Sequence, residues 1–122
     1  YSPSSMPSSE NLSLQREAMV ALFESTNGSS WQGNTNWLTN ISVCKWYRVT
    51  CTGDIVTRLY LNNNNLQGSI PTEIGYLMQL EEMSLYSNSL TGLIPSTLAN
   101  LSSLQLIYLY SNSLTGLILS SL

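Results

Sequence analysis

A 24-residue repeat dominates the second half of this chain of 122 residues. The stretch LYLNNNNLQGSIPTEIGYLMQLEE, which begins at Leu59, is followed by MSLYSNSLTGLIPSTLANLSSLQL and then by IYLYSNSLTGLILSSL. Five apolar columns, one asparagine column and one glycine column recur at this period: Leu59/Met83/Ile107, Leu61/Leu85/Leu109, Leu66/Leu90/Leu114, Ile70/Ile94/Ile118, Ile74/Leu98/Leu122, Asn64/Asn88/Asn112 and Gly68/Gly92/Gly116. A period of about 20–29 residues with an LxLxxNxL core indicates a solenoid of stacked repeats.

Each repeat predicts one short strand, because the two leucines of LxL alternate with polar residues and point to the same side. Stacked strands of this kind pair in parallel, so we expect an α/β solenoid, right-handed, with a parallel sheet on its concave side. The amide of each repeated asparagine can donate and accept hydrogen bonds. Asn64, Asn88 and Asn112 are therefore expected to form a ladder that satisfies backbone groups of neighbouring repeats.

Composition excludes several classes of function. Only 9% of the residues are charged, and four basic against seven acidic residues give a net charge of −3, so a nucleic-acid partner is not expected. No apolar run reaches the roughly 18 residues that span a bilayer. The chain has no histidine, and its many serines have no evident base, so we expect no catalytic residue, no metal site and no cofactor.

The N-terminal part of the chain changes character twice before the repeats. Residues 1–9 are rich in serine and proline and predict a flexible arm. An amphipathic helix is expected from about residue 13 to 25, with Ser13 as its N-cap and the Asn27–Gly28 pair at its end. Its apolar face should cover the next segment, and the residues expected on that face are Leu14, Ala18, Ala21 and Leu22.

Three tryptophans, Trp31, Trp37 and Trp46, follow the helix within a segment rich in glycine, asparagine and serine. They could form a platform for a carbohydrate. We favour the alternative that they fill the core of a cap, because the first repeat of a solenoid needs an atypical unit over its open end.

Cys44 and Cys51 are the only cysteines, with six residues between them. A redox pair or a metal site is the alternative to a disulfide, but the spacing is not C-x-x-C and no further thiol or histidine completes a metal shell. We therefore predict a structural disulfide. Together with N-x-S/T sequons at Asn11, Asn27, Asn40 and Asn100, it favours a secreted or extracellular protein, on a cell surface or in a cell wall.

The chain carries four successive motifs: a helix that contains ALFEST, a W…NW segment, C-x-W-x-x-V-T-C, and LxLxxNxLxGxIP. Through these motifs it resembles the plant-type extracellular leucine-rich-repeat family. That resemblance implies a helical N-terminal cap over residues 10–54 and repeats over residues 55–122, with the last repeat incomplete. It also implies relatedness to receptor ectodomains and polygalacturonase-inhibitor-like proteins. Two positions depart from the family pattern: Arg48 stands where glycine is usual, and Leu119 stands where the other copies have Pro71 and Pro95.

The residues that alternate outward from the strands are the candidate site. Tyrosine offers a large, rigid contact area with a polar tip, which suits recognition, although it also suits exposed strand positions in general. Glu81 and Glu82 are adjacent, so alternation predicts that their side chains point apart. The predicted partner-binding residues are Arg58, Tyr60, Asn62, Glu82, Ser84, Tyr86, Leu106, Tyr108 and Tyr110.

Three functions compete at this stage. The first is a non-catalytic module that binds a protein or peptide partner on the tyrosine-rich concave face. The second is a structural subunit of a larger assembly, in which further repeats or another chain cover the apolar edge of the last repeat. The third is ice or polysaccharide binding, for which Thr91 and Thr115 align but Gln67 interrupts the column.

Overall fold

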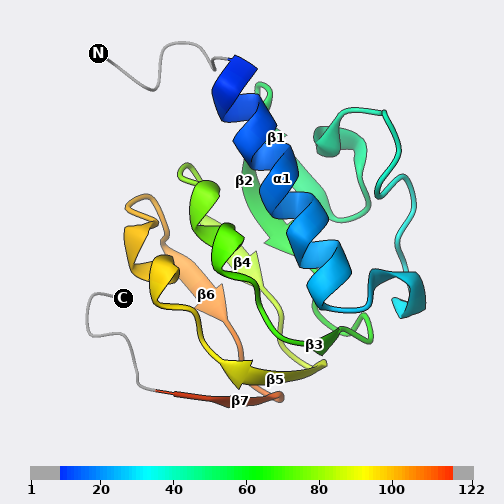
Figure 1. The fold of residues 1–122 in the computed structure, drawn as a ribbon, viewed down its shortest axis with the longest axis vertical. Helices are drawn as coiled ribbons and strands as arrows, with labels where there is room; N and C mark the ends of the chain where they lie inside the picture. The colour runs from blue at the N-terminus through cyan, green and yellow to red at the C-terminus, as the bar shows by residue number, and fades with distance from the viewer. Residues whose placement is uncertain (1–8, 117–122) are drawn as a thin grey trace.

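Two sheets run through the stacked repeats of the computed structural model, which describes residues 9–116 (Figure 1). The first sheet has four strands in the order β1-β2-β4-β6, and the second has three in the order β3-β5-β7. Helix α1 lies across the cap end of the first sheet (Figure 1). The strands are β1 (Val49–Thr52), β2 (Ile55–Tyr60), β3 (Gln67–Gly68), β4 (Glu82–Ser84), β5 (Ser89–Leu93), β6 (Leu106–Tyr108) and β7 (Ser113–Thr115). The helices are α1 (Ser9–Ser25) and four 3₁₀ turns, η1 (Gly28–Ser30), η2 (Val43–Lys45), η3 (Thr72–Tyr76) and η4 (Ser96–Asn100).

The strand register reproduces the 24-residue period. Arg58 pairs with Glu82 and Glu82 with Leu106, and all three strands of this ladder are parallel, as expected from the repeats. Strand β1 was not expected: it pairs antiparallel with β2 and places Val49 opposite Leu59. The cap therefore contributes its own strand to the edge of the repeat sheet, which pairs an edge that would otherwise be open.

The repeated asparagines form the predicted ladder. Asn88 Oδ1 accepts from the backbone N–H groups of Asn64 (2.9 Å) and Leu66 (3.0 Å), and Asn88 Nδ2 donates to the carbonyl of Leu61 in the preceding repeat. Asn112 repeats this pattern one turn later, accepting from the backbone N–H of Leu90. Each asparagine thus ties two successive repeats together at the point where the strand ends.

The inward columns form a continuous core. In the first two copies the strand positions and the Leu66/Leu90 column are at most 1% exposed. The equivalent residues of the third copy, Ile107, Leu109 and Leu114, are only partly buried. Leu119, and the column members Ile118 and Leu122, lie outside the described residues, as does the predicted arm apart from Ser9.

Helix α1 begins earlier than predicted. It starts at Ser9, so Ser13 lies inside the helix and is not its N-cap. The buried face is also rotated: Ala18 and Leu22 are on it, but Leu14 and Ala21 are only half-buried, and the face is completed by Gln15, Met19 and Phe23. The misplacement arose because Gln15 is polar, and its burial depends on partners far away in the sequence.

The end of α1 follows the sequence. Asn27 adopts a left-handed conformation (φ 59°), which asparagine tolerates better than most residues. A Cβ at Gly28 would stand 2.2 Å from Cδ2 of Phe23, so the chain can turn against that ring only with glycine. Arg48, which replaces the family's usual glycine, also has positive φ (67°), and its guanidinium carbon lies 5.4 Å from the ring centroid of Tyr47.

The three tryptophans fill the cap core, as the second interpretation above predicted. Trp31 and Trp37 are 5% exposed and Trp46 is 2% exposed, so they form no open carbohydrate platform. Trp37 is central: its ring centroid lies 4.8 Å from that of Trp31 and 5.0 Å from that of Trp46. Each indole N–H donates to a backbone carbonyl, which removes the cost of burying it.

Candidate functional site

The outward side chains of β2, β4 and β6, with those just beyond their ends, form one surface, which we call the sheet face. Strand register sets its rows: Arg58, Glu82 and Leu106 lie side by side, and so do Tyr60, Ser84 and Tyr108. Backbone bonds from Asn63 N to Tyr86 O and from Ser87 N to Tyr110 O extend the alignment beyond the strands. The third row is therefore Asn62, Tyr86 and Tyr110, and the nine predicted residues do come together.

Three tyrosines form a compact aromatic cluster at one end of the sheet face. The rings of Tyr86 and Tyr110 stack with centroids 4.8 Å apart and an interplanar angle of 8°. Tyr108 stands nearly perpendicular to both, at 6.4 Å and 6.2 Å. Tyr108 is 44% exposed and Tyr110 is 59% exposed, so the cluster presents aromatic surface to solvent instead of burying it.

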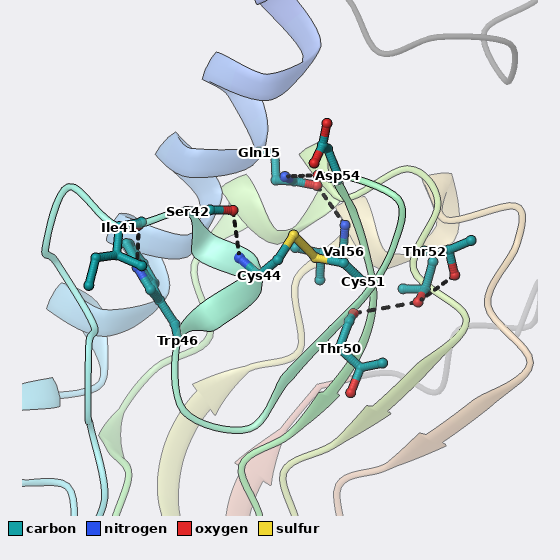
Figure 2. Close-up of a disulfide and its surroundings, with 11 residues drawn as sticks. Gln15, Ile41, Ser42, Cys44, Trp46, Thr50, Cys51, Thr52, Asp54 and Val56 are labelled. Atoms are coloured by element: carbon teal, nitrogen blue, oxygen red, sulfur yellow. Dashed lines mark hydrogen bonds between the residues drawn. A yellow bond between two sulfur atoms is a disulfide. The ribbon is translucent and has the colours of Figure 1, made fainter.

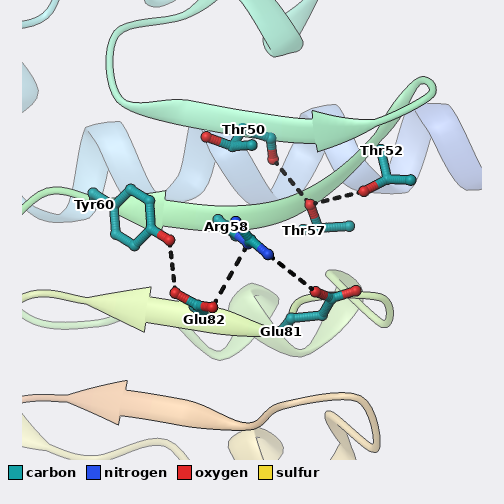
Figure 3. A network of polar contacts seen from close by, with 7 residues as sticks. All are labelled: Thr50, Thr52, Thr57, Arg58, Tyr60, Glu81 and Glu82. Carbon is teal, nitrogen blue, oxygen red and sulfur yellow. Dashed lines mark hydrogen bonds and ion pairs between the residues drawn. The ribbon is translucent and has the colours of Figure 1, made fainter.

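Tyr60 does not join this cluster. Its hydroxyl donates to Glu82 Oε1 at 2.6 Å, and Arg58 Nε lies 3.7 Å from Glu82 Oε2 (Figure 3). The hydrogen bond to Glu82 is the main reason that the pKa of Tyr60 is raised; partial burial and the negative charge of Glu82 act in the same direction, while Arg58 opposes them. The sheet face thus divides into an aromatic cluster and a charged cluster.

The predicted divergence of Glu81 and Glu82 is wrong. Both carboxylates reach Arg58, since Glu81 Oε1 lies 4.0 Å from Arg58 Nη2 (Figure 3). Glu81 precedes β4, which begins at Glu82, so strand alternation does not apply to it. The charged cluster therefore comprises Arg58, Tyr60, Glu81 and Glu82, and Glu81 is a member that the sequence did not identify.

Ser84 departs from its predicted role as a contact residue. It is only 4% exposed, and its hydroxyl donates to Asn62 Oδ1 at 3.1 Å. A small side chain between Tyr60 and Tyr108 in its row is covered by its larger neighbours. Ser84 therefore orients Asn62 and cannot contact a partner without rearrangement.

The predicted disulfide is present: Cys44 in η2 and Cys51 in β1 are joined (Figure 2). Close to it, Gln15 connects the helix to the β1–β2 turn, because its Nε2 donates to Asp54 O (3.0 Å) and its Oε1 accepts from Val56 N (2.8 Å). Gln15 is 6% exposed, and its role could not be read from its own polar identity.

Within residues 9–116, no three or more His, Cys, Asp or Glu side chains are grouped so that they could hold a metal ion. In the same part of the chain, no helix has both the length and the apolar character needed to cross a membrane. The four sequon asparagines, Asn11, Asn27, Asn40 and Asn100, are all exposed and lie outside β2, β4 and β6, and their glycosylation remains a prediction.

Comparison with known proteins identifies the repeats. The family model described as "Leucine rich repeat" matches residues 55–114. The receptor-like kinase TMK4 of Arabidopsis thaliana is 41% identical over 70 residues, which is 56% of this chain and 7% of that protein. In five of the curated relatives, the aligned part covers between 7% and 23% of the relative's length, so the chain spans less than a quarter of each.

Solved structures agree with the sequence match. The BIR2 ectodomain from Arabidopsis thaliana superimposes with a TM-score of 0.77 at 28% identity, over 85% of this chain and 58% of that one. The Arabidopsis receptor kinase HAESA, solved with the peptide hormone IDA and the co-receptor SERK1, gives a TM-score of 0.65 at 27% identity, over 91% of this chain and 18% of that one. By its repeats the chain belongs to the leucine-rich-repeat family, and it is similar to plant receptor-kinase ectodomains. The polygalacturonase-inhibitor-like branch stays a prediction.

Proposed function

We propose that this protein is a non-catalytic recognition module that binds a protein or peptide segment on the concave, tyrosine-rich sheet face. The observation that carries this proposal is the aromatic cluster of Tyr86, Tyr108 and Tyr110. Fold stability does not require aromatic residues there, because the core is made by the inward columns. Rigid tyrosines at the centre of an interface contribute strongly to affinity at a low cost in side-chain entropy.

The charged cluster would orient the ligand. Arg58, Glu81 and Glu82 carry a net charge of −1 beside the tyrosines, and Tyr60 holds the Glu82 carboxylate in place. Charged groups at the rim of an interface contribute mainly to specificity and association rate. A ligand that spans both clusters would therefore be selected by charge at one end and by aromatic contact at the other.

The family supports this proposal. HAESA, a protein with the same fold, is described with a peptide hormone and a co-receptor, so a peptide or protein partner is the ligand class that we infer. The Cys44–Cys51 disulfide and the similarity to receptor ectodomains support an extracellular location.

The test is a triple substitution, Tyr86→Ala, Tyr108→Ala and Tyr110→Ala. Native partners are first captured on the wild-type protein and identified, and their affinity is then measured by calorimetry. The triple variant should raise the dissociation constant at least about tenfold. Leu93→Ser, at a 68% exposed apolar position on β5, is the matched control and should leave binding unchanged. Unchanged affinity in a folded triple variant would refute the proposal.

A second candidate function is that of a structural subunit, and one observation favours it. Ile107, Leu109 and Leu114 are only partly buried, whereas the equivalent residues in the preceding two copies are buried completely. Further repeats or another chain would bury them. Intact-mass measurement of the native material distinguishes these cases, because a mass above 13.5 kDa plus glycans indicates further repeats, and a companion chain at fixed stoichiometry indicates an assembly.

Ice or polysaccharide binding receives less support. The Thr91 hydroxyl donates to Gly68 O, and the Thr115 hydroxyl donates to Gly92 O. These hydroxyl protons therefore link successive repeats of the second sheet. Their alignment has a structural explanation, so it does not point to a ligand.

A further inference from the structure

A groove opens at the edge of the fold where β2 and β4 begin, away from the tyrosine cluster. Its volume is about 510 Å³, within the range of about 300–1,000 Å³ found for ligand sites. Its walls are the first half of α1, the facing ends of β1 and β2, the end of η3 with the segment that leads to β4, and two residues before β6. The side chains most relevant to its chemistry are Leu14, Ile55, Tyr76, Met78, Gln79 and Glu81.

The apolar residues that line the groove do not recur in the next repeat. At the 24-residue period, Tyr76 corresponds to Asn100, and Met78 corresponds to Ser102. Ile55 likewise corresponds to Gln79 and Ser103. The next repeat thus places polar residues, including an N-glycosylation sequon, where the repeat beside the cap places tyrosine and methionine.

The fold does not need these apolar side chains. Tyr76 is 43% exposed and Met78 is 60% exposed, while Leu77 between them is 2% exposed and fills the core. The corresponding Leu101 is buried between Asn100 and Ser102 in the same way. Exposed apolar residues that the repeat pattern does not demand mark a contact surface, and methionine adapts to varied partners.

Three polar side chains of the groove floor, Gln15, Thr52 and Thr57, are already hydrogen-bonded within the protein. The amide of Gln15 is bonded through both its oxygen and its nitrogen, as described above. The Thr57 and Thr52 hydroxyls lie 3.3 Å apart and bond to each other. An occupant would therefore gain little from hydrogen bonds to this floor, and burial of apolar surface is the main attraction on offer.

Charge selects the kind of occupant. Of the described residues that line the groove, Glu81 alone is charged. Asp54, whose carbonyl accepts from the groove residue Gln15, adds an exposed carboxylate at the β1–β2 turn. Arg58 pairs with both Glu81 and Glu82, which leaves a net charge of −1 on these three residues, so together with Asp54 they make the rim acidic and complementary to a cation.

We propose that this groove is a second docking site, which takes an apolar side chain from a partner protein segment with a lysine or arginine next to it. The apolar side chain contacts Leu14, Ile55, Tyr76 and Met78. The cationic side chain lies beside Glu81. The groove shares Glu81 with the charged cluster of the sheet face, but it is separate from the aromatic cluster, because none of Tyr86, Tyr108 and Tyr110 lines it.

A random-peptide phage library tests the proposal without a known partner. The protein is made in a bacterial periplasm, where the disulfide forms and no N-glycan is added, because Asn11 lies in the groove wall. Phage are selected on the wild-type protein and counter-selected on the Tyr76→Gln/Met78→Ser variant. The second repeat carries Asn100 and Ser102 at these positions, so the fold should tolerate the change.

We expect selected peptides to combine an apolar residue with a neighbouring lysine or arginine. Their affinity should fall at least about tenfold on Met78→Ser and about two- to fivefold on Glu81→Gln, the range of an exposed ion pair. The Leu93→Ser and Tyr110→Ala variants should bind the selected peptides with the same affinity as the wild-type protein. As a measurement that needs no variant, the methyl NMR signals of Met78 and Ile55 should shift on addition of a selected synthetic peptide.

Three results would overturn the proposal. One is that no peptide distinguishes the wild type from a folded Tyr76→Gln/Met78→Ser variant. Another is that the selected peptides are acidic, or are insensitive to Glu81→Gln. The third is that binding moves the signals of the tyrosine cluster and leaves Met78 and Ile55 unchanged, which would assign the peptides to the sheet face.

Discussion

The cap and the repeats bury their cores in different ways. In the cap, four aromatic rings (Phe23, Trp31, Trp37 and Trp46) pack against one another, and each ring has its own set of contacts. In the repeats, apolar side chains at the same positions of each copy fill the core, and one asparagine per copy forms hydrogen bonds to the backbone. A defect in the cap should therefore be large and local, whereas a defect in the repeats should depend on how many neighbours the affected copy has.

The two regions meet at Asn64. Its Oδ1 accepts from Gly33 N at 2.7 Å, and its Nδ2 donates to Gly33 O at 2.9 Å. The cap thus supplies the backbone partners that a preceding repeat would otherwise supply. The asparagine ladder continues into the cap, although the cap has no repeat pattern of its own.

The largest effect is expected for Trp46→Ala in the cap. Trp46 is 2% exposed, packs against Trp37, and donates its indole N–H to Ile41 O at 3.0 Å. Its removal should lower the free energy of unfolding by about 3–5 kcal/mol. Urea denaturation measures this change, and Tyr110→Ala, at an exposed ring, should cost far less. Equal losses for the two variants would mean that the aromatic cap core is not a separate source of stability.

Asn88→Ala should give the next largest loss, in the repeats. Two backbone N–H groups would lose the acceptor Asn88 Oδ1, and the Leu61 and Leu85 carbonyls would lose a donor, at a cost of about 3 kcal/mol. Asn112→Ala is the matched comparison and should cost less, about 2 kcal/mol, because Asn112 Nδ2 makes the equivalent donations to Leu85 O and Leu109 O but its Oδ1 accepts from Leu90 N, one bond fewer than at Asn88, beside a less buried repeat. Thermal unfolding of both variants tests the order, and a larger loss for Asn112→Ala would contradict it.

Removal of the disulfide should weaken the cap by a smaller amount. The Cys44→Ala/Cys51→Ala variant opens a short loop, and chain entropy predicts a loss of about 2.5 kcal/mol. Hydrogen exchange should locate the change in residues 43–52, with the Leu85 and Leu90 amides still protected. Protection lost equally in both regions would show that cap and repeats unfold as one unit.

The smallest effect is expected at the charged cluster. Glu82→Gln replaces the charged acceptor of the Tyr60 hydroxyl with a neutral, weaker one, so the pKa of Tyr60 should fall toward its usual value of about 10. Because the raised pKa belongs to the folded state, its contribution to stability is present below the unfolded pKa and is lost as pH rises through the folded pKa. Absorbance titration of the phenol measures the shift. A pKa of Tyr60 that does not fall in the variant would contradict the role of Glu82.

Sequence reasoning reached the repeats far better than the cap. The inward columns and the asparagine ladder could be predicted because each copy repeats the same local environment. The apolar and asparagine positions of the three copies therefore all indicate the same stacked strands. In the cap, the start of α1 and the burial of Gln15 were missed, since both depend on contacts with residues such as Asp54 and Val56. The disulfide was predictable because no other cysteine competes.

The candidate site was predictable as a set but not as an arrangement. Alternation placed nine residues on one face correctly, yet it could not show that Ser84 is covered or that Tyr60 bonds to Glu82. Alternation also failed at Glu81, which lies before the strand. The outward positions vary from copy to copy, and a period carries no information about side chains that do not repeat.

By itself, the sequence determined the stacking of this protein, because burial of the repeated leucines and pairing of the repeated asparagines leave one register. Only the tertiary structure decided which outward residues act together. Tyr86, Tyr108 and Tyr110 contact one another across strands, Glu81 and Glu82 share Arg58, and Leu14 meets Tyr76 and Met78 in a groove. These contacts join residues far apart in the chain, and they depend on side-chain rotamers and on how the cap helix lies against the first repeat.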